Sequence, residues 1–437
     1  MIEALRNAFR LPDLRRRLLY TVLILVIFRL ASNIPVPGVD RLALKAFFET
    51  ATATSQLAGI LDMLSGGAIA NFSVLAAGVY PYVTATIVLQ LIVPIFPKLE
   101  QRLKEEGEQG QRKMNQWGFY LTVPLAMLQA FGQAQIFRSA TTGAGPILPN
   151  FGWGAGQVLP TITLLLTMTA GTMFAVWLGE LISEQGIGNG LSLIIFGGIV
   201  SRIPNNLRSI GETDHFIGVV IYVVVMIVTM LFIVFFQDGE RRIKVQYGKR
   251  VRGMKVYGGG STYIPLKVNT AGMIPLIFAQ SILTFPSAIA QFFVNSTTPA
   301  IRQLASGTID FFNGKNPLYA PIYFLAVFAF TFFYTFVIIE QQNLPEMLQK
   351  QGGFIPGVRP GKKTEEFILG VYKRITLVGA LFLAIVAVLP FVVGLFMNSN
   401  LMLIQSSGLL IVVGTVMDTM RQLEAQLLMR NYEGFLR

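Results

Sequence analysis

The fold is set by an uninterrupted apolar run at residues 216–236, which reads FIGVVIYVVVMIVTMLFIVFF. None of these side chains carries a charge. An α-helix rises about 1.5 Å per residue, so roughly 20 apolar residues cross the hydrocarbon core of a bilayer, which is about 30 Å thick. The run therefore predicts a transmembrane helix.

Further runs of this kind occur along the whole chain, and together they predict an all-α polytopic membrane protein with ten transmembrane helices. The weakest run, residues 188–203, is short and rich in glycine. The final two runs share one charge-free stretch that is split at Asn398-Ser399-Asn400. The other runs lie at 18–34, 74–97, 114–137, 157–179, 188–203, 270–294, 317–339, 375–396 and 401–417.

The composition agrees with this class and excludes several others. Of the 437 residues, 53% are hydrophobic and 13% are charged, against about 25% charged residues in a soluble domain. The absence of cysteine excludes disulfides, thiolate metal sites and a cysteine nucleophile. The single histidine, His215, excludes a metal site built from several histidines. We therefore expect no catalytic residues, no bound metal and no cofactor.

Positive charge is divided unequally between the two sides of the predicted spans. An even number of spans places both termini on one side of the membrane. Segments on that side hold 27 of the 35 lysine and arginine residues, the opposite connections hold 7, and Arg29 lies within a span. Cytoplasmic loops carry the excess of basic residues, so both termini are predicted to be cytoplasmic. The net charge of +12 favours an anionic partner or a charged membrane face.

Two other classes of membrane protein are less well supported. A secondary transporter usually binds its coupling ion at titratable residues near the bilayer midplane, whereas Glu180, Glu340 and Asp418 lie at predicted cytoplasmic ends of spans. A membrane-embedded enzyme would need catalytic groups at that depth. The nearest match to a phosphate-binding loop, residues 357–364, has the wrong spacing for one.

Two predicted cytoplasmic connections, residues 237–269 and 340–374, are long. Residues 237–267 hold eight basic and two acidic residues, and the alternation of Ile243, Val245 and Tyr247 with polar residues weakly indicates a strand. Such a loop suits anionic lipid headgroups or an anionic partner such as RNA. In the second connection, the density of glycine and proline at 352–361 predicts a shaped, non-helical loop.

A shorter apolar segment, residues 58–70, precedes the second predicted span on the opposite side. It is too short to cross a membrane, and small residues dominate it. It could therefore pack inside a protein cavity as a re-entrant helix. It suits an amphipathic helix lying on the outer surface equally well.

Five motifs follow one another in the order and spacing of a known family, from about residue 10 to the C-terminus. Together they resemble the SecY family, the central subunit of the bacterial protein-conducting channel. Ala31 stands where the family usually has glycine, and Phe119 stands where relatives often have a basic residue. The motifs are RLASNIPVPG at 29–38, YPYVTATIVLQL at 80–91, GIGNG at 186–190, KVYGGGSTYIPLKVN at 255–269 and GFIPGVRPG at 353–361.

The resemblance implies two inverted halves around a central pore, residues 1–210 with spans one to five and residues 211–437 with spans six to ten. Unfolded polypeptides bearing signal sequences would cross through the pore, and membrane helices would leave sideways into lipid. The implied partners are the SecE and SecG subunits, the SecA motor ATPase, the ribosome and anionic lipids. The implied location is the plasma membrane of a bacterium.

The resemblance also assigns residues to a gate. A ring of bulky apolar side chains would seal the pore against ions, because it offers no ligand to replace hydration water. A plug on the outer side of this ring would be formed by residues 58–70. The ring maps to Val83, Ile87, Leu191, Ile195, Ile274, Ile277 and Ile411, and the plug to Gly59, Ile60, Leu61, Asp62, Met63, Leu64, Gly66 and Gly67.

A third implied site is the docking surface for the ribosome or the motor. Arg359 stands out within it, because the prolines and glycines on either side limit its backbone freedom. A guanidinium held in this way can bind a carboxylate or phosphate with two hydrogen bonds, which lysine cannot imitate. The docking residues are Arg241, Arg242, Lys249, Arg250, Lys255 and Arg359.

Overall fold

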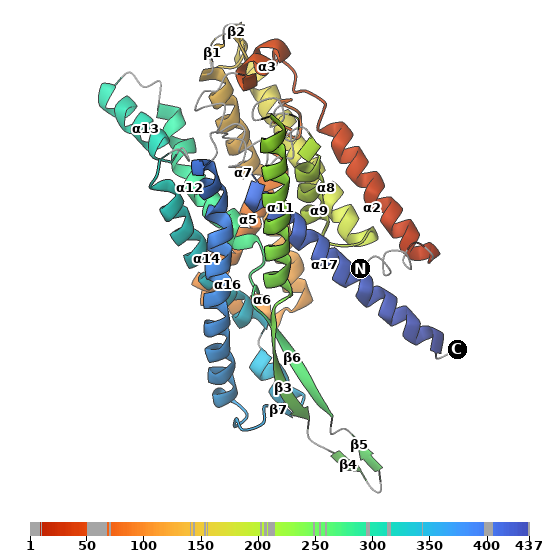
Figure 1. Ribbon diagram of the computed structural model, residues 1–437. Helices are drawn as coiled ribbons and strands as arrows, with labels where there is room; N and C mark the ends of the chain where they lie inside the picture. Colours follow the sequence, from red (N-terminus) through yellow and green to blue (C-terminus); the bar gives the residue numbers. More distant parts are fainter. Residues whose placement is uncertain are drawn as a thin grey trace. The chain divides into compact units, whose positions relative to one another are not determined.

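The computed structural model is mostly α-helical, which confirms the predicted class (Figure 1). Its described residues group into two compact units. Unit 1 comprises residues 1–216, 284–316 and 411–437, and unit 2 comprises 217–283 and 317–410. The predicted division at residue 210 is a different partition and stays a prediction. The structure describes residues 9, 11–49, 68–69, 71–139, 141–142, 145–152, 154, 156–201, 203–204, 208, 215–247, 250–252, 255–257, 260–293, 298–312, 316–342, 344–396 and 405–435.

Unit 1 is built mainly from helices of the first half of the sequence, joined by the end of the chain. Two long helices contain a boundary between the units. Both α12 (Ile274–Phe293) and α17 (Gln405–Phe435) begin in unit 2 and end in unit 1. The other elements of unit 1 are α2 (Pro12–Ala31), α3 (Arg41–Glu49), α5 (Tyr80–Ile95), α6 (Pro97–Glu105), α7 (Glu108–Ser139), β1 (Thr141–Thr142), β2 (Gly145–Pro146), α8 (Val158–Gln185), α9 (Gly190–Val200) and α13 (Pro299–Phe311).

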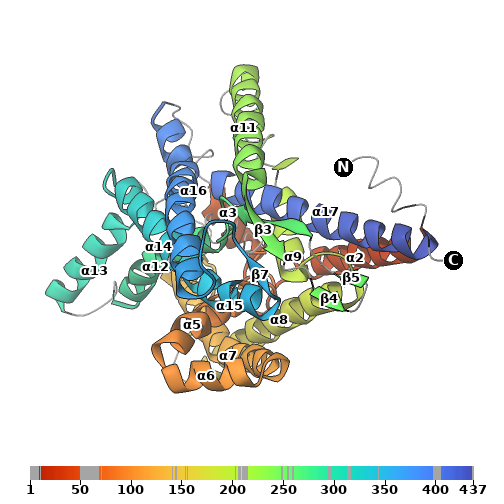
Figure 2. The same ribbon diagram turned by 90° about the horizontal axis from the view of Figure 1, so that it is seen from below.

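Unit 2 combines long helices with the β-structure of the two large connections. Its helices α14 and α16 lie side by side in both views (Figure 1 and Figure 2). Its elements are α11 (His215–Asp238), β3 (Glu240–Tyr247), β4 (Arg250–Arg252), β5 (Lys255–Tyr257), β6 (Ser261–Lys267), α14 (Tyr319–Gln342), α15 (Leu344–Lys350), β7 (Gly353–Phe354) and α16 (Lys362–Phe396).

Each of the ten predicted spans coincides with a helix, although several helices run past the predicted ends. Among the described residues, three stretches are long and apolar enough to cross a membrane: Val158–Gln185, Tyr319–Lys350 and Lys362–Leu389. Gly190–Val200 and Tyr222–Asp238 are shorter apolar helices. The helical positions of the spans are therefore confirmed, and their number as membrane crossings stays a prediction.

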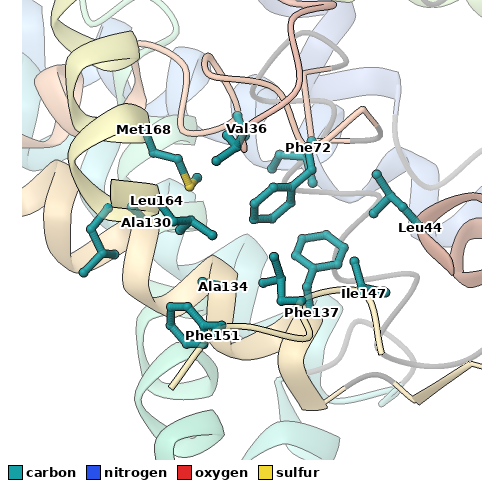
Figure 3. Close-up of a cluster of buried hydrophobic side chains, with 14 of the residues drawn as sticks. Val36, Leu44, Phe72, Ala130, Ala134, Phe137, Ile147, Phe151, Leu164 and Met168 are labelled. Carbon is teal, nitrogen blue, oxygen red and sulfur yellow. The ribbon is translucent and has the colours of Figure 1, made fainter. Parts of the chain in front are cut away.

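A large core cluster of unit 1 packs α7 and α8 around the segment that follows α2 (Figure 3). Phe72 is fully buried and meets Phe137 edge to face, with ring centroids 4.9 Å apart. The Val36 amide donates to the Phe72 carbonyl oxygen at 3.0 Å, and the Val74 amide donates to that of Ile34 at 2.9 Å. These bonds join the chain before the predicted plug to the chain after it.

A second seam in unit 1 joins α2, the loop between α8 and α9, and α17. The Ile187 amide donates to the Thr21 hydroxyl oxygen at 3.3 Å, and the Gly188 amide donates to the Gln422 side-chain oxygen at 3.1 Å. Ile187 is also buried between Leu14 and Leu423. Gly188 has a φ of +91°, which glycine adopts without strain. The GIGNG motif therefore links the first and last described long helices of the chain.

In unit 2 the two large connections form one layer. Strands β6, β3 and β7 form an antiparallel sheet in that order, and β3 and β6 extend as a long hairpin with β4 and β5 at its tip (Figure 1). The weak strand signal at 243–247 is thereby confirmed as β3. One face of the hairpin buries Ile243 and Val245 against Leu348 and Ile368. We call β3, β6, β7, α15 and the start of α16 the loop layer.

Candidate functional site

Five of the predicted ring residues belong to unit 1. Val83 and Ile87 lie one turn apart on α5, and Ile87 is buried. Leu191 and Ile195 lie one turn apart on α9, where both pack partly buried against a core cluster that includes Tyr82 on α5. Ile411 is buried on α17. The helical spacing that the pairs require is present, because residues four apart share a helix face.

The remaining ring residues, Ile274 and Ile277, lie on the first turn of α12 in unit 2. Ile277 is buried and Ile274 is half-buried. All seven residues thus occupy helices and none is fully exposed, as a gasket requires. Their assembly into one ring stays a prediction.

The plug residues assigned above lie outside the described part of the chain. The described end of that segment, Ala68 and Ile69, is fully buried in unit 1. The chain that follows this segment, up to Val74, is closely packed. The Ser73 amide donates to the Ala68 carbonyl oxygen at 2.8 Å. The Val74 carbonyl oxygen lies so close to Gly171 of α8 that a Cβ at position 171 would clash with it. The described end of this segment, at Ala68 and Ile69, is therefore held in the core of unit 1. The plug itself stays a prediction.

The docking residues of the first connection lie on the hairpin of the loop layer. Arg241 and Arg242 are exposed on β3, and the Arg242 Nε is 2.7 Å from a carboxylate oxygen of Glu240. Arg250 lies on β4 and Lys255 on β5, and Lys249 lies outside the described residues. Ile243 and Val245 face the core, and Arg242 and Lys244, which alternate with them along β3, are exposed.

Arg359 lies in the turn that joins β7 to α16, and its side chain is exposed. The turn begins with a hydrogen bond from the Val358 amide to the Ile355 carbonyl oxygen at 3.0 Å. Gly357 and Gly361 have φ values of +86° and +100°, in the left-handed region. The guanidinium therefore leaves the surface from a hydrogen-bonded turn. That this turn limits the freedom of Arg359 for docking stays a prediction.

Thr364 holds the backbone of the Arg359 turn, a contact that sequence reasoning missed. Its hydroxyl donates to the Arg359 carbonyl oxygen at 3.0 Å, and its amide donates to the Gly361 carbonyl oxygen at 2.9 Å. The Thr364 side chain is buried. A threonine five residues after the arginine, at the start of a helix that follows Pro-Gly, is the signal that could have indicated this role.

The loop layer brings together the two connections that are predicted to be cytoplasmic, which the sequence had presented as separate. Gln246 pairs with Phe354 and Tyr247 with Gly353, and Ile355 packs in the same core as Ile243. The layer offers charged surface and backbone edges, and so it can bind a partner. Within the described residues, no group of three acidic or histidine side chains is placed to hold a metal ion.

Comparisons with known proteins agree with this arrangement. The SecY family model matches residues 73–420. A protein translocase subunit SecY from Halalkalibacterium halodurans is 42% identical over 449 aligned residues, which cover 100% of both chains. The subunit of the same name from Thermotoga maritima is 40% identical over 442 residues, covering 100% of this chain and 98% of its own.

The fold is also similar to those of solved channels. A protein-conducting channel matches with a TM-score of 0.60 at 17% identity, covering 94% of this chain and 91% of the other. Sec61 in the canine ribosome–channel complex from the endoplasmic reticulum matches with a TM-score of 0.60 at 16% identity and the same coverage. At these identities the likeness concerns the fold.

Proposed function

The chain belongs to the SecY family, and from this premise we propose how its parts serve a protein-conducting channel. It is a multi-pass membrane protein and a channel subunit of a protein translocase, and it is not an enzyme. The observation that carries this conclusion is the 42% identity to a translocase subunit over the full length of both chains.

We propose that unfolded secretory polypeptides cross through a pore and that membrane-protein helices leave it sideways into lipid. Ions are excluded at rest by the ring of Val83, Ile87, Leu191, Ile195, Ile274, Ile277 and Ile411. Residues 58–70 act as the plug. The buried positions of Ile87, Ile277 and Ile411 and the anchored end at Ala68 support these roles.

We further propose that the chain works in the plasma membrane of a bacterium with both termini in the cytoplasm. The lysine and arginine bias of 27 to 7 supports this orientation. SecE and SecG are its partner subunits, and the motor SecA or the ribosome docks on the loop layer. Cations there neutralise phosphates of ribosomal RNA or carboxylates of the motor.

Reconstitution tests this function directly. Vesicles that hold the chain together with SecE and SecG should protect a preprotein from added protease when SecA and ATP are supplied. Vesicles that lack the chain should give no protection. Absence of protected preprotein, with the chain inserted in the expected orientation, would contradict the proposal.

Replacing Thr364 by valine should lower the apparent affinity of the channel for its motor about fivefold, since one lost hydrogen bond costs about 1 kcal/mol. The substitution keeps the buried volume and removes the bond to the Arg359 carbonyl oxygen. The measurement is the motor concentration at half-maximal translocation. Thr364→Ser retains the hydroxyl and should behave as wild type, so equal affinities of the two variants would reject a positioning role.

A cysteine at position 64 should report the movement of the plug. A thiol-specific reagent in water should label Leu64→Cys slowly in the idle channel and quickly when a substrate is lodged, because displacement exposes the segment. The chain has no competing thiol. Leu42→Cys is the control, since Leu42 on α3 is 76% exposed and should be labelled quickly in both states. Equal rates at position 64 would favour a surface helix.

A further inference from the structure

A charged pocket in unit 1 is lined by none of the predicted pore or docking residues. It has a volume of about 800 Å³, in the range of small-molecule sites. Its walls come from the start of α2, the end of α8 and the C-terminal part of α17. The apolar seam of Leu14, Ile187 and Leu423 holds these three elements together beside it.

The pocket carries both signs of charge. Arg16 and Arg17 on α2 supply two cations, and Asp13 and Glu184 supply two carboxylates. Gln426 on α17 adds an amide that can donate or accept hydrogen bonds. An anion alone would meet two carboxylates in this site, and a cation alone would meet two guanidinium groups. The lining therefore matches a ligand that carries one charge of each sign.

The position of the pocket indicates where such a ligand comes from. Helix α8, which contains one of the candidate membrane spans, ends at Gln185, and Gln185 lines the pocket. Helix α2 is mostly apolar after Arg17. The pocket thus lies at the height where membrane-spanning helices meet the cytoplasmic headgroups, and the arginines point to the phosphates found there.

An exposed apolar stripe on α2 continues from the pocket. Leu19, Leu23, Val26 and Leu30 follow Arg16 at alternating spacings of three and four residues, so all five share one face of the helix. Each of the four apolar side chains is about half exposed or more. From Leu19 to Leu30 the stripe runs about 16 Å, close to the thickness of one leaflet, which is about 15 Å.

We propose that this pocket and stripe bind one zwitterionic phospholipid with a primary ammonium, a phosphatidylethanolamine, from the cytoplasmic leaflet. Arg16 and Arg17 bind its phosphate, Glu184 and Asp13 accept hydrogen bonds from its ammonium, and an acyl chain lies along Leu19, Leu23, Val26 and Leu30. A choline headgroup has the same charges but no N–H to donate, and a glycerol headgroup has no cation. The site therefore distinguishes ethanolamine from both.

Native mass spectrometry of the purified channel, with its partner subunits, tests the assignment. The complex is released from detergent containing equal amounts of phosphatidylethanolamine, phosphatidylcholine and phosphatidylglycerol. Wild type should retain phosphatidylethanolamine about tenfold better than either competitor, as expected when two charge-assisted contacts are satisfied together. Equal retention of the three lipids, or a preference for phosphatidylglycerol, would overturn the proposal.

Substitutions separate the two halves of the site. Glu184→Gln should abolish the preference over phosphatidylcholine and phosphatidylglycerol, and Arg16→Gln with Arg17→Gln should lower retention of all three lipids. Arg15→Gln is the matched control, because Arg15 is an exposed member of the same arginine triplet and does not line the pocket. If Arg15→Gln lowered lipid retention as much as Arg16→Gln, the lipids would be held by general charge attraction alone, and the proposal would be overturned.

A photoactivatable group on Leu23→Cys checks the occupant in native membranes. Adducts to lipid support the proposal, whereas adducts mainly to a polypeptide show that another protein covers the stripe and contradict it. Each variant should elute as a single folded species on size-exclusion chromatography. Translocation activity is not the readout, so a failure here is distinguishable from a failure of the channel function.

Discussion

Replacing Arg359 by glutamate is expected to slow preprotein translocation about tenfold or more, since a hydrogen bond to a charged group contributes about 1.5–3 kcal/mol and reversal adds repulsion. The turn between β7 and α16 aims this guanidinium, and the Thr364 hydroxyl pins its backbone. The protein should remain folded and inserted, because the Arg359 side chain is exposed. The measurement is translocation into vesicles with channel amounts matched by immunoblot.

Two further variants define what Arg359 does. Arg359→Lys keeps the charge but loses the paired hydrogen bonds, and it should be partly active. Arg241→Glu changes the charge equally on β3, but clustered cations share the contact and salt screens them, so its effect should be smaller. Full transport by Arg359→Glu, or loss of transport that merely follows degradation of the channel, would reject the role.

Replacing Ile87, Ile195 and Ile277 together by serine is expected to make the idle channel leak small ions. Serine hydroxyl groups keep water in the constriction, so an ion can pass while it remains hydrated, which an apolar ring prevents. A barrier lowered by about 1.4 kcal/mol multiplies a rate about tenfold, so resting conductance should rise by at least about that factor. Single-channel recording across a planar bilayer measures it.

The same three helices offer a matched control for the ring. Ile92 on α5, Val200 on α9 and Ile282 on α12 are each more than a third exposed. Serines at these positions introduce the same chemistry away from the proposed gasket, and resting conductance should stay at the wild-type level. The ring assignment fails if both triple variants leak equally, or if neither does.

The positions of the helices were predictable from the sequence because apolar runs of membrane length leave few other structures. Their ends were less predictable. α16 begins at Lys362, 13 residues before the predicted span at 375–396, since lysine and glutamate propagate a helix as readily in water as leucine does in lipid. Hydropathy predicts only the apolar part of a helix, whereas the helix itself can continue into water with polar residues.

The loop layer was only partly predictable, because pairing between distant strands leaves little trace in either strand alone. The alternation around Ile243 indicated β3, but β7 is two residues long and carries no pattern of its own. The bond from Thr364 to Arg359 was hidden for a similar reason. Local chemistry made Arg359 stand out, whereas the side chain that supports it reads as an ordinary helix start.

The seam between α2, the α8–α9 loop and α17 can be completed only late in synthesis of the chain. Gly188 and Gln422 are 234 positions apart, so the polypeptide that carries the first partner must wait for the second to be synthesised. At about 5–20 residues per second this delay is roughly 10–50 s. Leu14 and Ile187 lack the cover of Leu423 throughout that interval. A chain that ends before Gln422 and Leu423 would leave this seam uncovered permanently.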